Sequence, residues 1–298
     1  MQEPGTRWPD FFLVGAVKAG TTSLYRYLDQ HPAVFLPRVK EPHHFAPRFD
    51  PGPLDSSRAV RDREAYLALY AEAGRDRCAG DCSPYYLWDA DSPRLIREVR
   101  PDARILMVLR NPVERAYSHF LMVARETRVR GSFLDELRTD RDKRGRRWSE
   151  SNLYFELGLY AGQLRRYRAC FPEEQLRVTL YDDLVAGPDA LVRNLWAFLG
   201  LPDTEASLDT ATRHNPASVP RGPLARLALA SRRGAHRLRL HRLLPLGLKT
   251  ALHDRVLLRP EPPPPLPADA RDWLRDAYRE SVADLADLLD RPLDHWLT

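Results

Sequence analysis

Short apolar runs alternate with longer amphipathic stretches along the first two thirds of the chain. Stretches with apolar residues three or four positions apart predict helices at residues 21–31, 63–73, 92–100, 112–120, 157–170 and 188–199. Short, wholly apolar runs predict buried strands at residues 11–14 (FFLV), 34–36, 104–109 (RILMVL) and 176–180. Such strands, separated by helices, are typical of a parallel sheet that is buried on both faces. The pattern therefore predicts an α/β fold, with a parallel β-sheet flanked by helices on both faces and a helical C-terminal part.

The order of these elements indicates one domain over residues 1–298, because no long linker interrupts the alternation. We expect an α/β core at 10–205, a loop and basic helical segment at 206–262, and a C-terminal part at 263–298. A run of four prolines separates the last part, whose helix is predicted at 268–289.

Composition narrows the class of protein. Hydrophobic residues make up 43% of the chain and charged residues 29%, which is ordinary for a soluble globular protein and excludes general disorder. The longest apolar runs are too short to span a bilayer, and the N-terminus shows no signal peptide. Three cysteines, Cys78, Cys82 and Cys170, form neither a full set of disulfides nor a tetrahedral metal site. We therefore expect a cytoplasmic protein without a metal ion.

The charge is unevenly distributed. Lys and Arg total 46 against 41 acidic residues, a net +5, but residues 221–260 hold ten basic residues and one acidic residue, Asp254. This segment is either a solvated helical face or a basic wall beside an anionic ligand. Nucleic-acid binding is the weakest alternative, because no aromatic residues are interleaved with the arginines.

The main chemical signal follows the first predicted strand, in the loop GAVKAGTTS. A glycine-bearing loop that leads into a helix N-terminus presents unpaired N–H groups and a partial positive charge to an anion. Lys18 adds a full charge, and the hydroxyls of Thr21, Thr22 and Ser23 add donors. The plain structural alternative is an ordinary strand-to-helix turn with Thr21 or Thr22 as the N-cap.

This loop is P-loop-like but departs from the nucleotide-triphosphatase pattern G-x-x-x-x-G-K-[ST]. Gly15 and Gly20 keep the spacing, yet Lys18 lies inside the loop and Thr21 follows the second glycine. The strand at 104–109 ends in Arg110, where a magnesium-dependent enzyme would place an aspartate. A cation there suits a second anion, which weighs against kinase chemistry.

Arg110 opens the segment RNPVERAYS, which ends at Ser118. Together with the first loop, this segment resembles the two-site signature of sulfotransferases that use 3′-phosphoadenosine 5′-phosphosulfate (PAPS). The resemblance implies that Arg110 and Ser118 hold the 3′-phosphate of PAPS. It also implies that the first loop holds the 5′-phosphosulfate through Lys18, Ala19, Gly20, Thr21, Thr22 and Ser23.

Further segments are similar to the branch that includes glycosaminoglycan sulfotransferases and many bacterial members. KEPHHF resembles its K-E-x-H-F-F segment, which implies Glu41 as general base and substrate contacts from Lys40 and His43. DCSPYY resembles its E-K-[ST]-P-x-Y segment, with Cys82 where lysine is common. The late segment NPASVPRG resembles the loop that closes over the nucleotide, which implies contacts from Arg221 and Gly222.

The resemblance implies metal-independent, in-line transfer of a sulfuryl group from PAPS to a hydroxyl or amine of a carbohydrate or natural product. Glu41 would take the acceptor's proton, with His43 and His44 as competing bases, and Lys18 would stabilise the leaving oxygen. A P-loop-like kinase and a nucleotide-binding module without transfer are the alternatives. The leucines in segment 224–244 are compatible with a lipid-linked or apolar acceptor, or with a homodimer contact.

Overall fold

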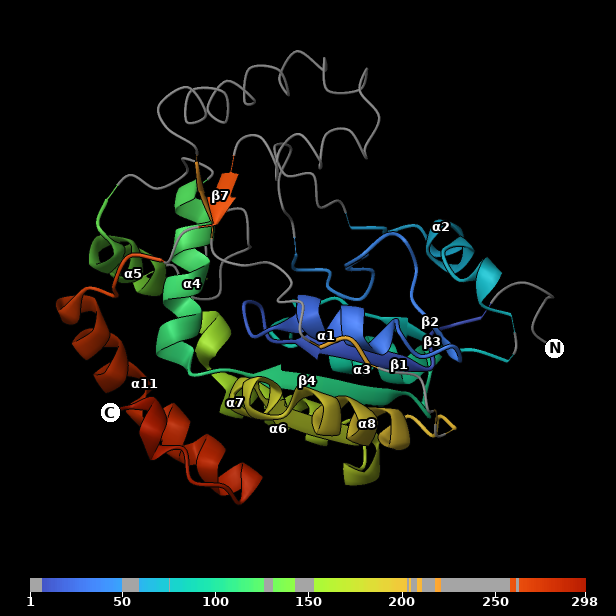
Figure 1. Ribbon diagram of the computed structural model, residues 1–298. Helices are drawn as coiled ribbons and strands as arrows, with labels where there is room; N and C mark the ends of the chain where they lie inside the picture. Colours follow the sequence, from blue (N-terminus) through green and yellow to red (C-terminus); the bar gives the residue numbers. More distant parts are fainter. Residues whose placement is uncertain are drawn as a thin grey trace, which may run out of the picture.

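A computed structural model describes residues 7–49, 59–74, 76–125, 131–142, 153–202, 204, 208–210, 218–220, 258–260 and 263–298. Its centre is a five-stranded sheet in the order β2-β3-β1-β4-β5, and all neighbouring strands run parallel (Figure 1). The strands are β1 (Phe11–Gly15), β2 (Val34–Phe35), β3 (Cys78–Asp81), β4 (Arg104–Leu109) and β5 (Leu176–Leu180). A separate antiparallel pair joins β6 (Ser218–Pro220) and β7 (Leu258–Pro260).

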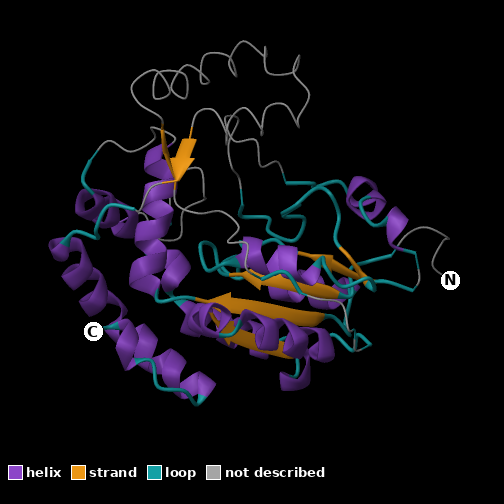
Figure 2. Cartoon of the chain, viewed as in Figure 1, coloured by secondary structure: helices purple, strands orange, loops and turns teal. Residues whose placement is uncertain are grey.

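Helices lie on both sides of the sheet, as the sequence pattern predicts (Figure 2). Helix α1 packs beside α8, and the long C-terminal helix α11 packs against α4 and α6. The α-helices are α1 (Thr21–Leu28), α2 (Arg63–Ala68), α3 (Ser92–Val99), α4 (Pro112–Arg125), α5 (Phe133–Asp142), α6 (Tyr160–Arg168), α7 (Tyr181–Ala186), α8 (Pro188–Phe198) and α11 (Ala268–Leu289). The 3₁₀ turns are Ala71–Ala73, Glu156–Gly158, Glu173–Gln175 and Asp294–Trp296.

The structure corrects several sequence-based expectations. Strand β3 and helices α5 and α7 were not anticipated. The expected helix at 63–73 is split into α2 and a 3₁₀ turn, and the one at 157–170 shortens to α6. Neither Thr21 nor Thr22 is the N-cap of α1, because Gly20 takes that place with a φ of 92°. An N-cap side chain needs an extended backbone, whereas here the chain enters the helix through a left-handed residue.

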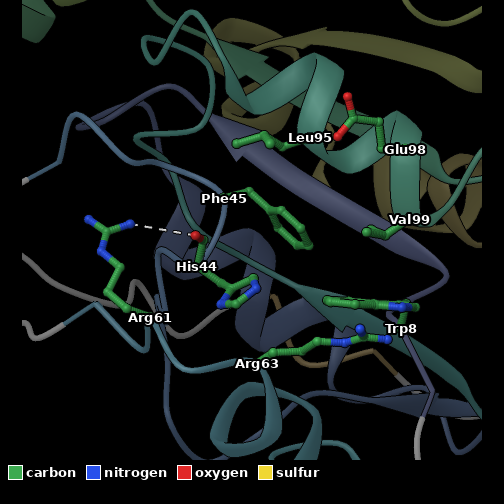
Figure 3. Close-up of a pocket in the computed structure, with 8 residues that line it drawn as sticks. All are labelled: Trp8, His44, Phe45, Arg61, Arg63, Leu95, Glu98 and Val99. Atoms are coloured by element: carbon green, nitrogen blue, oxygen red, sulfur yellow. Dashed lines mark hydrogen bonds between the residues drawn. The ribbon is translucent and has the colours of Figure 1, made fainter.

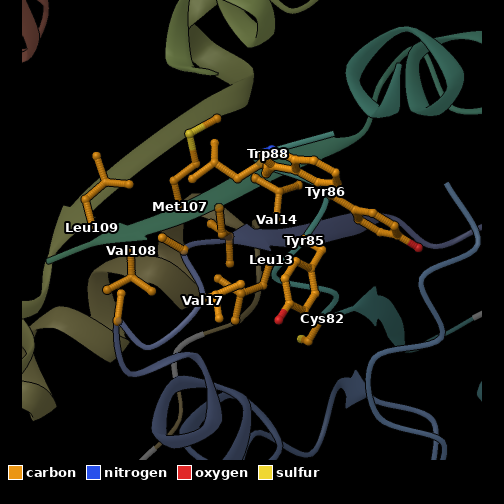
Figure 4. Close-up of a cluster of buried hydrophobic side chains, with 14 of the residues drawn as sticks. Leu13, Val14, Val17, Cys82, Tyr85, Tyr86, Trp88, Met107, Val108 and Leu109 are labelled. Atoms are coloured by element: carbon orange, nitrogen blue, oxygen red, sulfur yellow. The ribbon is translucent and has the colours of Figure 1, made fainter. Parts of the chain in front are cut away.

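The core forms around β1 and β4, whose apolar runs face helices on both sides. Phe11 through Val14 are fully buried, and the last five residues of β4 are at most 1% exposed. Burying one such side chain stabilises the fold by about 1.5–3 kcal/mol. Figure 4 shows β1 and β4 side chains gathered with aromatic residues that follow β3. These residues include Leu13, Val14, Met107, Val108, Leu109, Tyr85, Tyr86 and Trp88.

The strand order places the candidate chemistry. The chain runs from β1 outward to β2 and β3, then crosses back to β4 on the other side of β1. In open parallel sheets, ligands bind outside the carboxyl ends of the strands where the order reverses. The loop after β1, the segment after β2 and Arg110 after β4 all lie at that edge.

Candidate functional site

The loop after β1 has the form of an anion cradle. The first hydrogen bond of α1 joins Leu24 N to Gly20 O at 3.0 Å, so the N–H groups of Thr21, Thr22 and Ser23 precede the helical ladder. Lys18 is half-buried, has a φ of 67°, and its Nζ lies 3.8 Å from the sulfur of Met122 on α4. The loop therefore brings backbone N–H groups, hydroxyls and an ammonium group to one place, as expected for binding phosphate or sulfate.

Gly20 is required by both conformation and space. Its φ of 92° is in the left-handed region, and a Cβ atom would lie 3.0 Å from carbons of Tyr181 and Leu184. We expect Gly20→Ala to lower the free energy of unfolding by about 1–3 kcal/mol. Chemical denaturation measures this loss. Gly162→Ala is the control, because a Cβ there meets nothing within 4 Å; equal stabilities of the two variants would contradict the expectation.

Arg110 connects this loop with α4. Its guanidinium pairs with Glu114 at 2.8 Å, lies 4.8 Å from the centre of the Tyr181 ring, and donates to the carbonyl oxygen of Lys18 at 3.4 Å. Ser118 is half-buried one helical turn beyond Glu114, on the same face of α4. Arg110 therefore lies beside the loop after β1, and Ser118 lies within α4, which begins two residues after Arg110.

Sequence reasoning did not identify Tyr181 or Met122 as neighbours of the site. Tyr181 follows β5 directly, so its place at the carboxyl edge of a parallel sheet was a usable signal. It contacts the Arg110 guanidinium by a cation–π interaction and packs near Gly20. Met122 has no such signal, because its contact with Lys18 depends on how α4 packs.

The segment after β2 brings Lys40, Glu41 and His43 to the same edge. Lys40 Nζ lies 2.7 Å from Glu41 Oε1 and 2.8 Å from Thr22 Oγ1, so it links the candidate base to the loop after β1. The other oxygen of Glu41 lies 3.7 Å from His43 Nε2. The backbone is left-handed at both Glu41 (φ 60°) and His43 (φ 50°). Such strain at non-glycine residues is concentrated at functional sites.

Burial alone would raise the pKa of the Glu41 carboxyl, but contact with His43 and the charge of Lys40 outweigh it and lower the pKa to about 2. Because the folded pKa lies below the ordinary value of 4.5, ionised Glu41 stabilises the fold fully above pH 4.5. This stabilisation is lost as the pH falls toward 2.

We expect the difference in the free energy of unfolding between wild type and Glu41→Gln to shrink as the pH falls from 4.5 toward 2. Denaturation at a series of pH values checks it; a pH-independent difference would contradict the low pKa.

His43 and His44, the competing bases, have different surroundings from Glu41. His43 is fully buried, with its ring centre 4.1 Å from that of Phe49. His44 stacks on Tyr66 at 4.2 Å, and burial lowers its pKa. Glu41 keeps 27% of its side chain exposed. Glu41 therefore keeps a solvent access that its neighbour His43 lacks.

Two residues that were expected to contact the nucleotide, Arg221 and Gly222, lie outside the described residues.

Cys82 lies in the segment after β3 and is only 4% exposed. Burial raises the pKa of its thiol well above the ordinary range. A buried neutral thiol cannot supply the positive charge that a lysine at this position would provide.

A hollow of about 540 Å³ is lined by His44 and Phe45, together with residues of α2, α3 and the N-terminal segment (Figure 3). Its polar groups are already engaged. The Arg63 guanidinium lies over the Trp8 ring at 5.5 Å, Glu98 pairs with Arg94 at 2.5 Å, and Arg61 donates to backbone carbonyls. His44 and Phe45 belong to the segment after β2, whereas Trp8 and Glu98 precede β1 and β4. Lys18, Glu41 and Arg110 do not line the hollow, so we do not assign the candidate site to it.

An open parallel sheet with an anion loop after β1 and a cation after β4 defines an α/β protein of the P-loop-like class. Residues 63–205 match the profile of the sulfotransferase family. The crystal structure of a sulfotransferase from Alicyclobacillus acidocaldarius covers 98% of this chain and 100% of its own, with a TM-score of 0.73 and 29% identity. In sequence over these residues and in its fold, the chain is similar to sulfotransferases.

Curated relatives show the same similarity. Human carbohydrate sulfotransferase 15 is 25% identical over 269 residues, covering 72% of this chain and 48% of that protein. Mouse heparan sulfate glucosamine 3-O-sulfotransferase 6 is 29% identical over 200 residues, 66% of this chain and 54% of that protein. The chain spans about half the length of these relatives. Within the described ranges, no helix combines the length and apolar character needed to cross a bilayer.

Proposed function

We propose that the protein transfers the sulfuryl group of PAPS to a hydroxyl or amine of a carbohydrate or natural-product acceptor. The observation that carries this proposal is the pairing of two cationic elements at adjacent strand ends. Lys18 follows β1, Arg110 follows β4, and the Arg110 guanidinium reaches the Lys18 carbonyl oxygen. Two cationic residues at adjacent strand ends suit a ligand with two separate anionic groups, as PAPS has.

In the proposed reaction, the loop from Lys18 to Ser23 holds the 5′-phosphosulfate, and Arg110 with Ser118 holds the 3′-phosphate. Fixing both ends orients the sulfur for in-line attack. A bond forms from the acceptor atom to sulfur while the bond from sulfur to the phosphate oxygen breaks. Glu41 accepts the acceptor's proton, Lys18 stabilises the charge on the leaving oxygen, and adenosine 3′,5′-bisphosphate (PAP) is released. A sulfuryl group carries less charge than a phosphoryl group, so cations and amides suffice without a metal ion.

Calorimetric binding of PAP in metal-free buffer tests the donor site. We expect wild type to bind, and Lys18→Ala and Arg110→Ala to bind roughly ten- to a hundredfold more weakly, because each loses a charge-assisted contact worth about 1.5–3 kcal/mol. Arg94→Ala is the matched control, since Arg94 forms an i,i+4 pair with Glu98 just as Arg110 does with Glu114. We expect this control to bind PAP like wild type.

The outcomes separate the candidate functions. No PAP binding by folded wild type would overturn the proposal, and turnover of ATP with magnesium would then favour the kinase. PAP binding without transfer to any acceptor would favour a nucleotide-binding module. Incubation of ³⁵S-labelled PAPS with desulfated heparan, chondroitin and simple hydroxylated compounds identifies the acceptor. The names of the relatives make a carbohydrate the first to try.

A further inference from the structure

A buried carboxylate lies directly behind the segment that carries Glu41. Asp81 ends β3, is 0% exposed, and takes part in no ion pair within the described ranges. Three hydroxyl groups donate to it: Ser83 at 2.6 Å, Tyr66 at 2.7 Å and Tyr86 at 2.8 Å. A carboxylate buried without a cation is costly, so its hydrogen bonds must all be made.

Each of these hydroxyl-bearing residues also contacts one of three consecutive residues after Glu41. The hydroxyl oxygen of Ser83 accepts from His43 N at 3.1 Å, and that of Tyr86 accepts from Phe45 N at 3.3 Å. The Tyr66 ring stacks on the His44 ring at 4.2 Å. One carboxylate therefore anchors positions 43, 44 and 45 together; Figure 3 shows two of them, His44 and Phe45, side by side.

The anchored segment needs this support. The left-handed backbone at Glu41 and His43 is unfavourable for residues with a Cβ, and it persists only where surrounding contacts determine it. His43 is itself anchored, and Glu41 lies two residues before it. They set the direction of Glu41, whose oxygens contact Lys40 and His43.

We propose that Asp81 is a positioning residue for the transfer reaction. Through Ser83 and Tyr86 it fixes the backbone on which Glu41 is presented to the acceptor. This inference rests on the function proposed above, because Glu41 is taken as the base. Asp81 itself is too deeply buried to touch substrate.

The directions of these hydrogen bonds require a side chain at position 81 that accepts on both of its sides. Ser83 and Tyr86 already accept from backbone N–H groups, so their own protons must point to Asp81, which must accept from both. An asparagine would present an NH₂ group on one side. The hydroxyl facing that group would lose its acceptor, and its own proton would be left unpaired in a buried place, which weakens the anchor.

Asp81→Asn is compared with Asp89→Asn, a matched control. Asp89 is also 0% exposed, and it accepts from two backbone N–H groups, of Arg48 and Asp91, which lie outside positions 40–45. We expect Asp81→Asn to lower the turnover of PAPS at least about tenfold, within the range for a displaced general base. PAP affinity should change less than about threefold, since the donor loop is not anchored by Asp81. Amide exchange in the peptide covering residues 40–46 should accelerate only in Asp81→Asn.

Equal effects of the two substitutions on turnover and exchange would overturn the proposal, because burial alone would then explain them. If Asp81→Asn does not fold, Ser83→Ala and Tyr86→Phe replace it, with Tyr66→Phe as their control. Tyr66 keeps its ring contact with His44 in that variant, so we expect a smaller effect. Absence of PAP binding by wild type would refute the proposed function, whereas the exchange measurement would still decide whether Asp81 holds the segment.

Discussion

Replacing Glu41 by Gln is expected to lower the turnover of PAPS by about 10²–10⁴-fold, the loss usual for a positioned general base. Gln keeps the size of the side chain and can still accept from Lys40, but it cannot take a proton from the acceptor. Glu41 is ionised at neutral pH, since its pKa lies far below 7. It also retains solvent access, which the buried His43 lacks.

Measuring the affinity of Glu41→Gln for PAP shows whether the substitution removes only the base or also damages the donor site. Within the described part of the chain, Glu41 is linked to the loop after β1 through Lys40 alone, so we expect Glu41→Gln to bind PAP within about threefold of wild type. Glu98→Gln is the control, because it also removes a paired carboxylate but lies on α3. Turnover of Glu41→Gln near the wild-type rate would show that Glu41 is not the base, and His43 would be replaced next.

The central strands could be predicted because their side chains are apolar on both faces. β1 and β4 were predicted to within one residue from continuous apolar runs. β3 was missed because its sequence, Cys-Ala-Gly-Asp, is short, small and ends in a charge. Its Gly80 is needed where the Phe11 ring lies against the strand, since a Cβ would come within 2.1 Å of that ring. Tertiary packing, and not strand propensity, specifies this element.

In the candidate site, too, some features could be predicted from the sequence and others could not. Lys18 and Arg110 could be predicted to approach one another, because both follow adjacent strands of a parallel sheet. The bridge from Lys40 to Thr22 and Glu41 could not be predicted, because it depends on how the segment after β2 folds back. The role of Asp81 was hidden for a related reason. Its partners are scattered over residues 66, 83 and 86, and only the fold brings their hydroxyl groups together.

Replacing Lys18 by Met is the second change with a large expected effect. Met keeps an unbranched apolar side chain but removes the ammonium group, and with it the contact between Nζ and the Met122 sulfur. Loss of one preorganised donor to a developing anion costs about 10²–10³-fold in rate, so we expect turnover of PAPS to fall by that factor. PAP affinity should fall less, because the backbone N–H groups at the start of α1 remain in place.

The comparison with Arg110→Ala tests this assignment of roles. Arg110 is proposed to hold the 3′-phosphate, far from the bond that breaks, so its loss should weaken PAP binding more than it slows turnover at saturating PAPS. Lys18→Met should show the opposite ratio. Single-turnover measurements on both variants, with Arg94→Ala as the common control, give the two constants separately. If Lys18→Met slows turnover by less than about tenfold, charge on the leaving oxygen is stabilised elsewhere, and the N–H groups of Thr21 to Ser23 become the leading candidates.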